Sequence, residues 1–167
     1  MAKLLTRRWI FRAIALFLSF GLCLGMGLAK AIEPQKTIPT VDLVPQSQLL
    51  GQTTYIESCA TCHIAPPPAV MPVQTWQALI QDPQHYGVAI EPLKDPNRRL
   101  VWNYLKLYSR PIKEDENIPF RLSSSRYFKA LHPGVTMPKP LKLESCIQCH
   151  SAAQDFDFRN GLVEQPQ

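Results

Sequence analysis

The clearest amphipathic segment of the chain lies between residues 95 and 110. Its apolar side chains recur at helical spacing and share one face: Leu100, Val101, Tyr104, Leu105 and Tyr108. Asp95 is a favourable N-cap, and Pro96 suits the first helical position. Arg110-Pro111 ends the pattern, because proline cannot continue a helix. We therefore predict a helix between these two signals.

Shorter helices are predicted from similar patterns and from the signals that end them. They are a helix from about Ser47 into Cys59, followed by Pro66-Pro67-Pro68; a helix at 75–80, ended by Asp82-Pro83; a helix through Tyr127, Phe128 and Leu131, capped by Ser124 or Ser125 and ended by His132-Pro133-Gly134; and a short one from about Leu143. No segment alternates apolar and polar residues as a strand does. The predicted fold class is mostly α with extensive loops.

The same patterns divide the chain into four parts. Residues 1–31 form a leader, and the proline-containing residues 32–46 form an extended lead-in. Residues 47–112 and 113–167 form two halves. The second half opens with a charged run, Lys113-Glu114-Asp115-Glu116-Asn117, which we interpret as a solvated linker.

The leader has the organisation of a secretory signal peptide. Basic residues precede an apolar run from Ala13 to Ala29, and Ala29-Lys30-Ala31 offers a cleavage site before Ile32. The alternative is an uncleaved anchor, since the run is near the short end for a membrane span. Export to the periplasm, or to a thylakoid lumen in a photosynthetic host, follows from the first interpretation.

Removing the leader changes the composition. It takes away five basic residues and Cys23, which leaves thirteen basic and thirteen acidic side chains and four cysteines. A formal charge of zero, with no basic helix or interleaved aromatic patch, argues against a nucleic-acid partner. The sixteen prolines of the chain imply much irregular structure and a modest core. A domain of this kind commonly depends on a metal or a covalent cross-link.

The remaining cysteines form two copies of the pattern Cys-x-x-Cys-His. They are Cys59, Cys62 and His63 in the first copy, and Cys146, Cys149 and His150 in the second. This pentapeptide is the attachment signature of a c-type haem, in which each thiol forms a thioether and the histidine faces the iron. Two copies in an exported chain predict two covalently bound haem c groups.

Paired cysteines have three other common uses. Zinc sites also use Cys-x-x-Cys units, but they do not need a histidine directly after each pair. A thioredoxin-like pair expects a strand–helix setting, which the sequence lacks. Structural disulfides are the third alternative, because an exported chain would tend to oxidise bare thiols.

The axial ligands of the two irons can be chosen from few residues. Besides His63 and His150, the only histidines are His85 and His132, which gives one spare histidine for each iron. Locality would pair His85 with the first haem and His132 with the second, and a crossed pairing is the alternative. Methionine is the common rival ligand in cytochromes c, and the mature chain retains Met71 and Met137.

The chain resembles the dihaem cytochrome c family of exported bacterial electron carriers. The elements that carry the resemblance span about residues 55 to 160: the first motif with its proline-rich sequel, Met71-Pro72-x-x-x-Trp76, His85-Tyr86-Gly87, the segment Ser123 to His132, and Cys146 to Ala153. Asp82-Pro83 departs from the family's pattern just before His85.

This resemblance implies a first half similar to class I cytochromes c and an irregular second half organised by haem. It implies bis-histidine haems with His85 and His132 as distal ligands, and electron exchange with other redox proteins such as a cytochrome or a membrane cytochrome b. The function expected is electron transfer rather than catalysis. The alternatives are a small haem enzyme or a gas or redox sensor, either of which needs one open or displaceable axial position, and a fixed subunit anchored by an uncleaved leader.

Overall fold

The structure is a computed structural model that describes residues 9, 12, 14–18 and 41–160. The chain divides into two compact units, Met1–Lys36 and Thr37–Gln167. The described residues of the first unit are helical. The remainder of the predicted signal peptide, its cleavage site and most of the lead-in lie outside the described residues. Among the residues that are described, no helix is long and apolar enough to cross a membrane.

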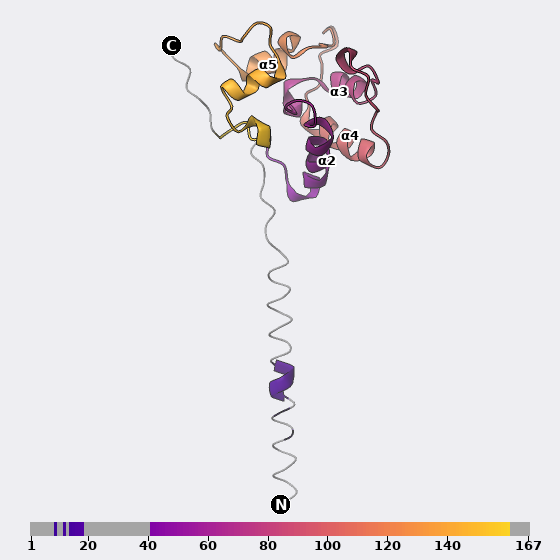
Figure 1. Cartoon of the computed structure of the whole chain (residues 1–167), viewed down its shortest axis with the longest axis vertical. Coiled ribbons are helices and arrows are strands. Elements are labelled where there is room, and N and C mark those ends of the chain that lie inside the picture. The colour runs from indigo at the N-terminus through magenta and orange to yellow at the C-terminus, as the bar shows by residue number, and fades with distance from the viewer. Residues whose placement is uncertain (1–8, 10–11, 13, 19–40, 161–167) are drawn as a thin grey trace, which may run out of the picture. The chain divides into compact units, whose positions relative to one another are not determined.

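Short helices joined by long loops make up the described part of the second unit (Figure 1). The α-helices are α2 (Leu49–Cys59), α3 (Val73–Leu79), α4 (Asn97–Tyr108) and α5 (Arg126–Leu131). Short 3-10 helices cover Gln46–Gln48, Pro68–Val70, His85–Gly87, Leu122–Ser124, Leu143–Gln148 and Ala153–Asp155. Residues 41–160 contain no β-strand, and one isolated bridge joins Pro72 to Arg110. The predicted class, mostly α with extensive loops, is confirmed.

The N-terminal caps predicted for α5 and α4 have different outcomes in the structure. The Ser125 hydroxyl caps α5 by accepting from the Phe128 amide at 3.4 Å, as one of the two predicted caps. The predicted cap of α4 is wrong, because Asp95 does not cap the helix. Its carboxylate accepts hydrogen bonds from Arg98 and Arg99, and α4 begins one residue after Pro96. The two arginines compete successfully for the carboxylate.

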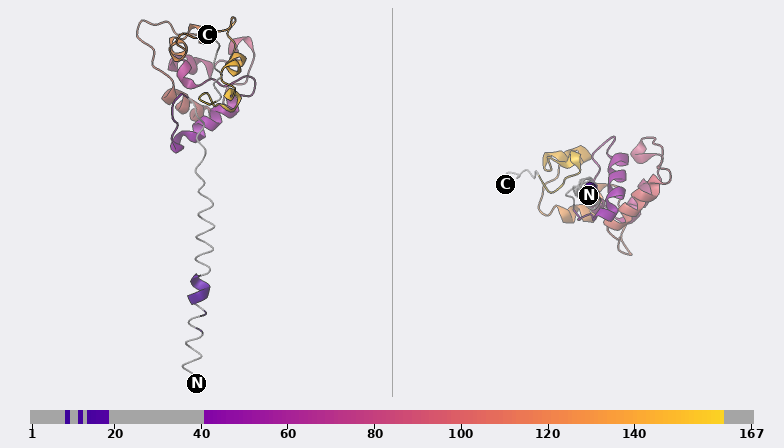
Figure 2. Two further views of the ribbon diagram at one scale, coloured as in Figure 1. Left: turned by 90° about the vertical axis from the view of Figure 1, so that its left-hand side faces the viewer. Right: turned by 90° about the horizontal axis from the view of Figure 1, so that it is seen from below.

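The core forms where α2 packs against α4 (Figures 1 and 2). Gly51 permits a close approach there, since a Cβ at this position would lie 3.0 Å from the Cβ of Tyr104. Tyr55 is fully buried at the centre. Its ring lies 5.5 Å from that of Tyr104, 6.0 Å from that of Trp76 and 5.8 Å from that of Phe156. Aromatic packing of this kind gives the small core much of its buried area.

The two predicted halves share this core and are joined by buried hydrogen bonds. Phe156 comes from the second half, yet it packs on Tyr55 of the first. The Ser125 hydroxyl donates to the Val70 carbonyl at 2.6 Å, and the Thr75 hydroxyl donates to the Pro119 carbonyl at 2.7 Å. The charged run at 113–117 is more than a solvated linker, because Glu116 forms an ion pair with Arg126 at 2.8 Å. The boundaries of the two halves stay a prediction.

Candidate haem-binding site

The first Cys-x-x-Cys-His motif begins at the end of α2. Cys59 is the last residue of the helix and is partly buried, whereas Cys62 is exposed in the turn that follows. The amide of Ala60 still donates to the Ile56 carbonyl at 2.9 Å, so the turn continues directly from the helix. The sequence placed this motif at the end of the helix, and the structure agrees.

The second motif lies on the 3-10 helix Leu143–Gln148 and the turn after it. The Cys146 carbonyl accepts from the amides of Cys149 and His150, at 3.2 and 2.8 Å. These bonds close the pentapeptide into a compact loop. The expected short helix is therefore present in its tighter 3-10 form. None of the four motif cysteines is in a disulfide.

Each motif histidine lies opposite one of the two spare histidines. The ring centroids of His63 and His85 are 6.1 Å apart, and those of His132 and His150 are 6.0 Å apart. These are the pairs that locality favours, not the crossed pairs. Met71, one of the rival ligands, is buried in the hydrophobic core, and Met137 packs at its edge. Iron ligation by the four histidines stays a prediction.

The spacing within each pair suits a metal held between two imidazoles. Two metal–imidazole bonds of about 2 Å, together with about 1 Å from each ring centre to its bonding nitrogen, add up to roughly 6 Å. The geometry does not favour the alternative, a metal ion bound directly by protein side chains. Among the described residues, no three His, Cys, Asp or Glu side chains converge on one point that could hold an ion. The two cysteine pairs therefore do not meet as a zinc site would require.

Backbone carbonyls determine the tautomer of three of these histidines. The Nδ1 atoms lie 2.9 Å from the Ile64 carbonyl for His63, 2.8 Å from the Phe128 carbonyl for His132, and 3.1 Å from the Phe158 carbonyl for His150. Because a carbonyl only accepts, Nδ1 carries the proton and Nε2 keeps the lone pair that a metal needs. The fourth ring differs, since Nδ1 of His85 is buried without a hydrogen-bond partner.

Burial disfavours the charged forms of two motif cysteines and two of the histidines. Burial raises the pKa of the Cys59 thiol to about 12, and it also raises the pKa of Cys146. Burial lowers the pKa of His85, and the neighbouring His63 lowers it further. The pKa of His150 is lowered in the same way by burial and then by His132. Neutral imidazole is the form that binds a metal.

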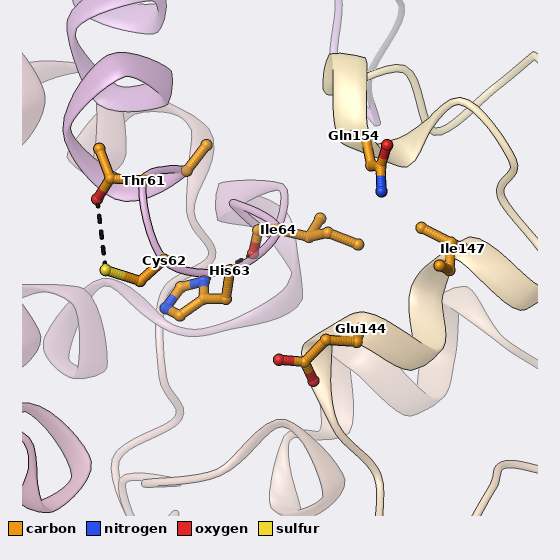
Figure 3. A pocket seen from close by; sticks show the side chains of 8 residues that line it. Thr61, Cys62, His63, Ile64, Glu144, Ile147 and Gln154 are labelled. Atoms are coloured by element: carbon orange, nitrogen blue, oxygen red, sulfur yellow. Dashed lines mark hydrogen bonds between the residues drawn. The ribbon is translucent and has the colours of Figure 1, made fainter.

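An open cavity of about 390 Å³ lies between the two motifs (Figure 3). Cys62, His63 and Ile64 line it from the first motif and the residue after it. Glu144 and Ile147 line it from the helix of the second motif. Ile64 and Ile147 point toward each other across it (Figure 3). The two attachment sites thus border a common space, although they are more than eighty residues apart in the sequence.

The sequence did not reveal the carbonyls that orient the histidines. One of them had a signal, because Phe128 lies four residues before His132 at the end of a predicted helix. The Phe158 carbonyl had none, since it reaches His150 only through the path of the C-terminal segment. The support of the His85 loop was also missed. There the Tyr86 hydroxyl donates to the Phe120 carbonyl at 2.5 Å, and Arg121 lies 5.3 Å from the ring centroid of Tyr86.

A loop-rich helical scaffold with two thioether-forming motifs, each beside a histidine pair, defines the class of multihaem c-type cytochromes. Comparison with known families narrows this class. The chain belongs to the dihaem cytochrome c family, whose model matches residues 55–158. Its cofactors are accordingly two haem c groups.

Two solved structures from Rhodobacter sphaeroides are similar to this chain. A diheme cytochrome c is 26% identical, with a TM-score of 0.48, and the match covers 75% of this chain and 99% of that one. DHC purified from the same organism is 25% identical, with a TM-score of 0.45, and the match covers 64% of this chain and 96% of that one. Among curated proteins, none matches the chain.

Proposed function

We propose that the protein is an exported electron carrier in which each haem iron is held by two histidines. The observation that carries this proposal is the presence of two histidine pairs with centroid separations of 6.1 and 6.0 Å, each joining a motif histidine to a spare one. With both axial positions taken by protein, no coordination site remains for a substrate. The proposed activity is therefore electron transfer, not catalysis.

In this proposal, the cysteines and histidines have separate roles. Haem supplies a one-electron change between ferric and ferrous iron. The four motif cysteines, Cys59, Cys62, Cys146 and Cys149, prevent loss of the cofactor outside the cell. Hydrogen bonds to backbone carbonyls orient three of the histidines and raise their basicity. Two imidazole ligands place the potentials below those of His/Met cytochromes, because a methionine ligand raises the potential.

The cavity between the motifs supports electron exchange within one molecule. It is bordered by His63 and Cys62 on one side and by Ile147 on the other, so haems attached at the two sites would adjoin the same space. An electron received at one haem could then leave from the other. Partners would be other redox proteins, such as a membrane cytochrome b, and their docking would be transient and small in area.

Export is proposed from the leader, with the periplasm, or a thylakoid lumen, as destination. Haem c is attached after export, which agrees with two attachment motifs behind a secretory leader. Mass spectrometry of the purified protein tests this directly. We expect an N-terminus at Ile32 and the added mass of two haems. A retained leader would favour an anchored subunit instead.

Ligation is tested by the variants His85→Ala and His132→Ala. In the ferric and ferrous states, the wild-type protein should be fully low-spin, and a redox titration should resolve two one-electron steps. Each variant should convert one of the two haems to a high-spin form while the other is unchanged. Met71→Leu serves as the matched control, because it replaces a rival ligand with an apolar side chain of similar volume. An unchanged low-spin spectrum in either histidine variant would contradict the proposal.

A further inference from the structure

The four candidate ligands are not held equally. His63, His132 and His150 each donate from Nδ1 to a backbone carbonyl, over 2.8 to 3.1 Å. His85 makes no such bond, although its Nδ1 is buried from solvent. It is the one member of the set without an acceptor.

A hydrogen bond at this position affects the strength of a ligand. It fixes the orientation of the ring and raises the basicity of the nitrogen that binds the metal. Loss of such a partner in metalloproteins typically costs about 10–100-fold in metal affinity. His85 is therefore expected to bind its iron more weakly than the other three histidines bind theirs.

The surroundings of His85 also differ from those of His132. His132 ends α5, and its ring packs 4.4 Å from that of the buried Phe128. His85 begins the short 3-10 helix His85–Gly87 within the loop segment 81–94, most of whose residues are exposed. The next residue, Tyr86, has a φ of 52°, in the left-handed region that residues other than glycine rarely adopt. His132 thus lies at a packed helix end, whereas His85 lies next to a residue with a strained backbone in an exposed loop segment.

A few contacts tie this loop to the rest of the unit. The Tyr86 hydroxyl donates to the Phe120 carbonyl, and the two rings lie 4.5 Å apart. Arg121 lies 5.3 Å from the ring centroid of Tyr86, and Leu93, near the end of the loop, packs against the hydrophobic core. Movement of His85 would have to loosen the Tyr86 contact first, which makes Tyr86 a positioning residue for this ligand.

We propose that His85 is a displaceable ligand, so that the first haem, and not the second, takes up a small neutral ligand such as a diatomic gas. The proposal rests on the bis-histidine ligation of the proposed function. In the exchange, the bond between iron and His85 breaks and the bond to the incoming ligand forms. The imidazole leaves as a neutral group, and no electron is transferred.

Carbon monoxide is the probe, added to the protein after full reduction with dithionite. We expect the absorption spectrum to change for one haem in two. The rate should be slow and independent of carbon monoxide concentration, because departure of His85 limits it. Absence of any change would overturn the proposal, and so would uptake by both haems at one rate.

Two variants assign the haem that responds. In His85→Ala, the first iron is already open, so uptake should be fast and confined to half of the haem. In His132→Ala, the second iron should react fast and the first should keep the slow wild-type phase. A slow phase that survives in His85→Ala and disappears in His132→Ala would place the displaceable ligand at the second haem and overturn the proposal.

A milder pair of variants retains all four histidines. Tyr86→Phe removes the hydrogen bond that ties down the His85 loop, and it should speed the slow phase by about fivefold, the factor that one hydrogen bond of about 1 kcal/mol provides. Tyr127→Phe is the control in α5, since it removes the bond that the Tyr127 hydroxyl donates to the Pro111 carbonyl and the one that it accepts from Arg126. An equal effect of both variants, or of neither, would contradict the role of the loop.

This experiment separates the two proposals. A reduced wild-type protein that is already high-spin before carbon monoxide is added would contradict bis-histidine ligation itself. A low-spin protein that ignores carbon monoxide would leave the electron carrier intact and would overturn only the displaceable His85.

Discussion

The imidazole planes of His132 and His150 stand almost perpendicular, at 84°. The first pair is arranged differently, because the planes of His63 and His85 are within 18° of parallel. The centroid separations are nearly the same, so the two pairs differ mainly in this angle. Axial ligands tune the electronic state of a haem iron. The two haems of the protein should therefore be distinguishable spectroscopically, although the ligand types proposed for them are identical.

We expect the oxidised protein to give two low-spin electron paramagnetic resonance signals of equal intensity. Parallel imidazoles separate the energies of the iron dπ orbitals and give a resolved rhombic signal. Perpendicular imidazoles leave these orbitals nearly degenerate and give an axial signal with a larger maximum g value. His85→Ala should abolish the rhombic signal and retain the axial one. A single signal accounting for both haems would show that the angles do not differ.

Ser125→Ala should destabilise the protein by about 1–3 kcal/mol. The Ser125 side chain is fully buried, donates to the Val70 carbonyl and caps α5, so the variant loses both contacts. Chemical denaturation of the holoprotein measures the loss. Ser124→Ala is the control, because this neighbouring serine is exposed and should change the free energy of unfolding by less than about 0.5 kcal/mol. Equal effects would show that the buried bond contributes nothing.

Gly51→Ala should destabilise the protein by about 1–2 kcal/mol, even though alanine is the better helix former. The new Cβ would lie 3.0 Å from the Tyr104 Cβ and 3.1 Å from the Leu100 carbonyl oxygen. Neither atom is at the flexible end of a side chain, so α2 and α4 must move apart. Thermal unfolding compares this variant with Glu57→Ala at an exposed position of α2. A stabilised Gly51→Ala would mean that the helices separate without cost.

Tyr55→Phe should cost about 1–3 kcal/mol near neutral pH, because the Pro66 carbonyl loses the hydroxyl that donates to it at 2.6 Å. Burial also raises the pKa of Tyr55 well above its usual value of about 10. Above a pH of about 10, the unfolded chain releases the Tyr55 proton while the folded chain keeps it, so the free energy of unfolding of the wild type falls.

Phenylalanine has no proton to lose at this position. The stability advantage of the wild type over Tyr55→Phe should therefore shrink as the pH rises past about 10. Urea denaturation near neutral pH and near pH 11 measures this difference. A difference that is the same at both pH values would contradict a buried, protonated Tyr55.

The helices could be predicted where one face had to be buried. Val101 and Leu105 repeat at helical spacing in α4, and both are fully buried in the structure. The start of the same helix could not be predicted, because Asp95 had a choice of partners. The backbone amides at the start of α4 and the side chains of two nearby arginines could all donate to the one Asp95 carboxylate. Which of them does so depends on side-chain positions that spacing alone does not specify.

The histidine pairs show a similar limit. The motifs and the scarcity of histidine were enough to nominate His85 and His132, and locality gave the pairs that the structure brings together. The unequal support of the rings was not accessible in this way. The Nδ1 partners of these rings are backbone carbonyls, which every residue possesses, and only the path of the chain determines which of them is in reach.

Phe156 has a consequence for how far this protein can be reduced in size. It follows the second haem motif, yet its ring is buried against Tyr55, next to the first. Cutting the chain at the charged run would leave Tyr55 facing water in one fragment and Phe156 in the other. Two one-haem proteins should therefore not result from such a division, and the pair of haems is the smallest unit that this sequence can fold around.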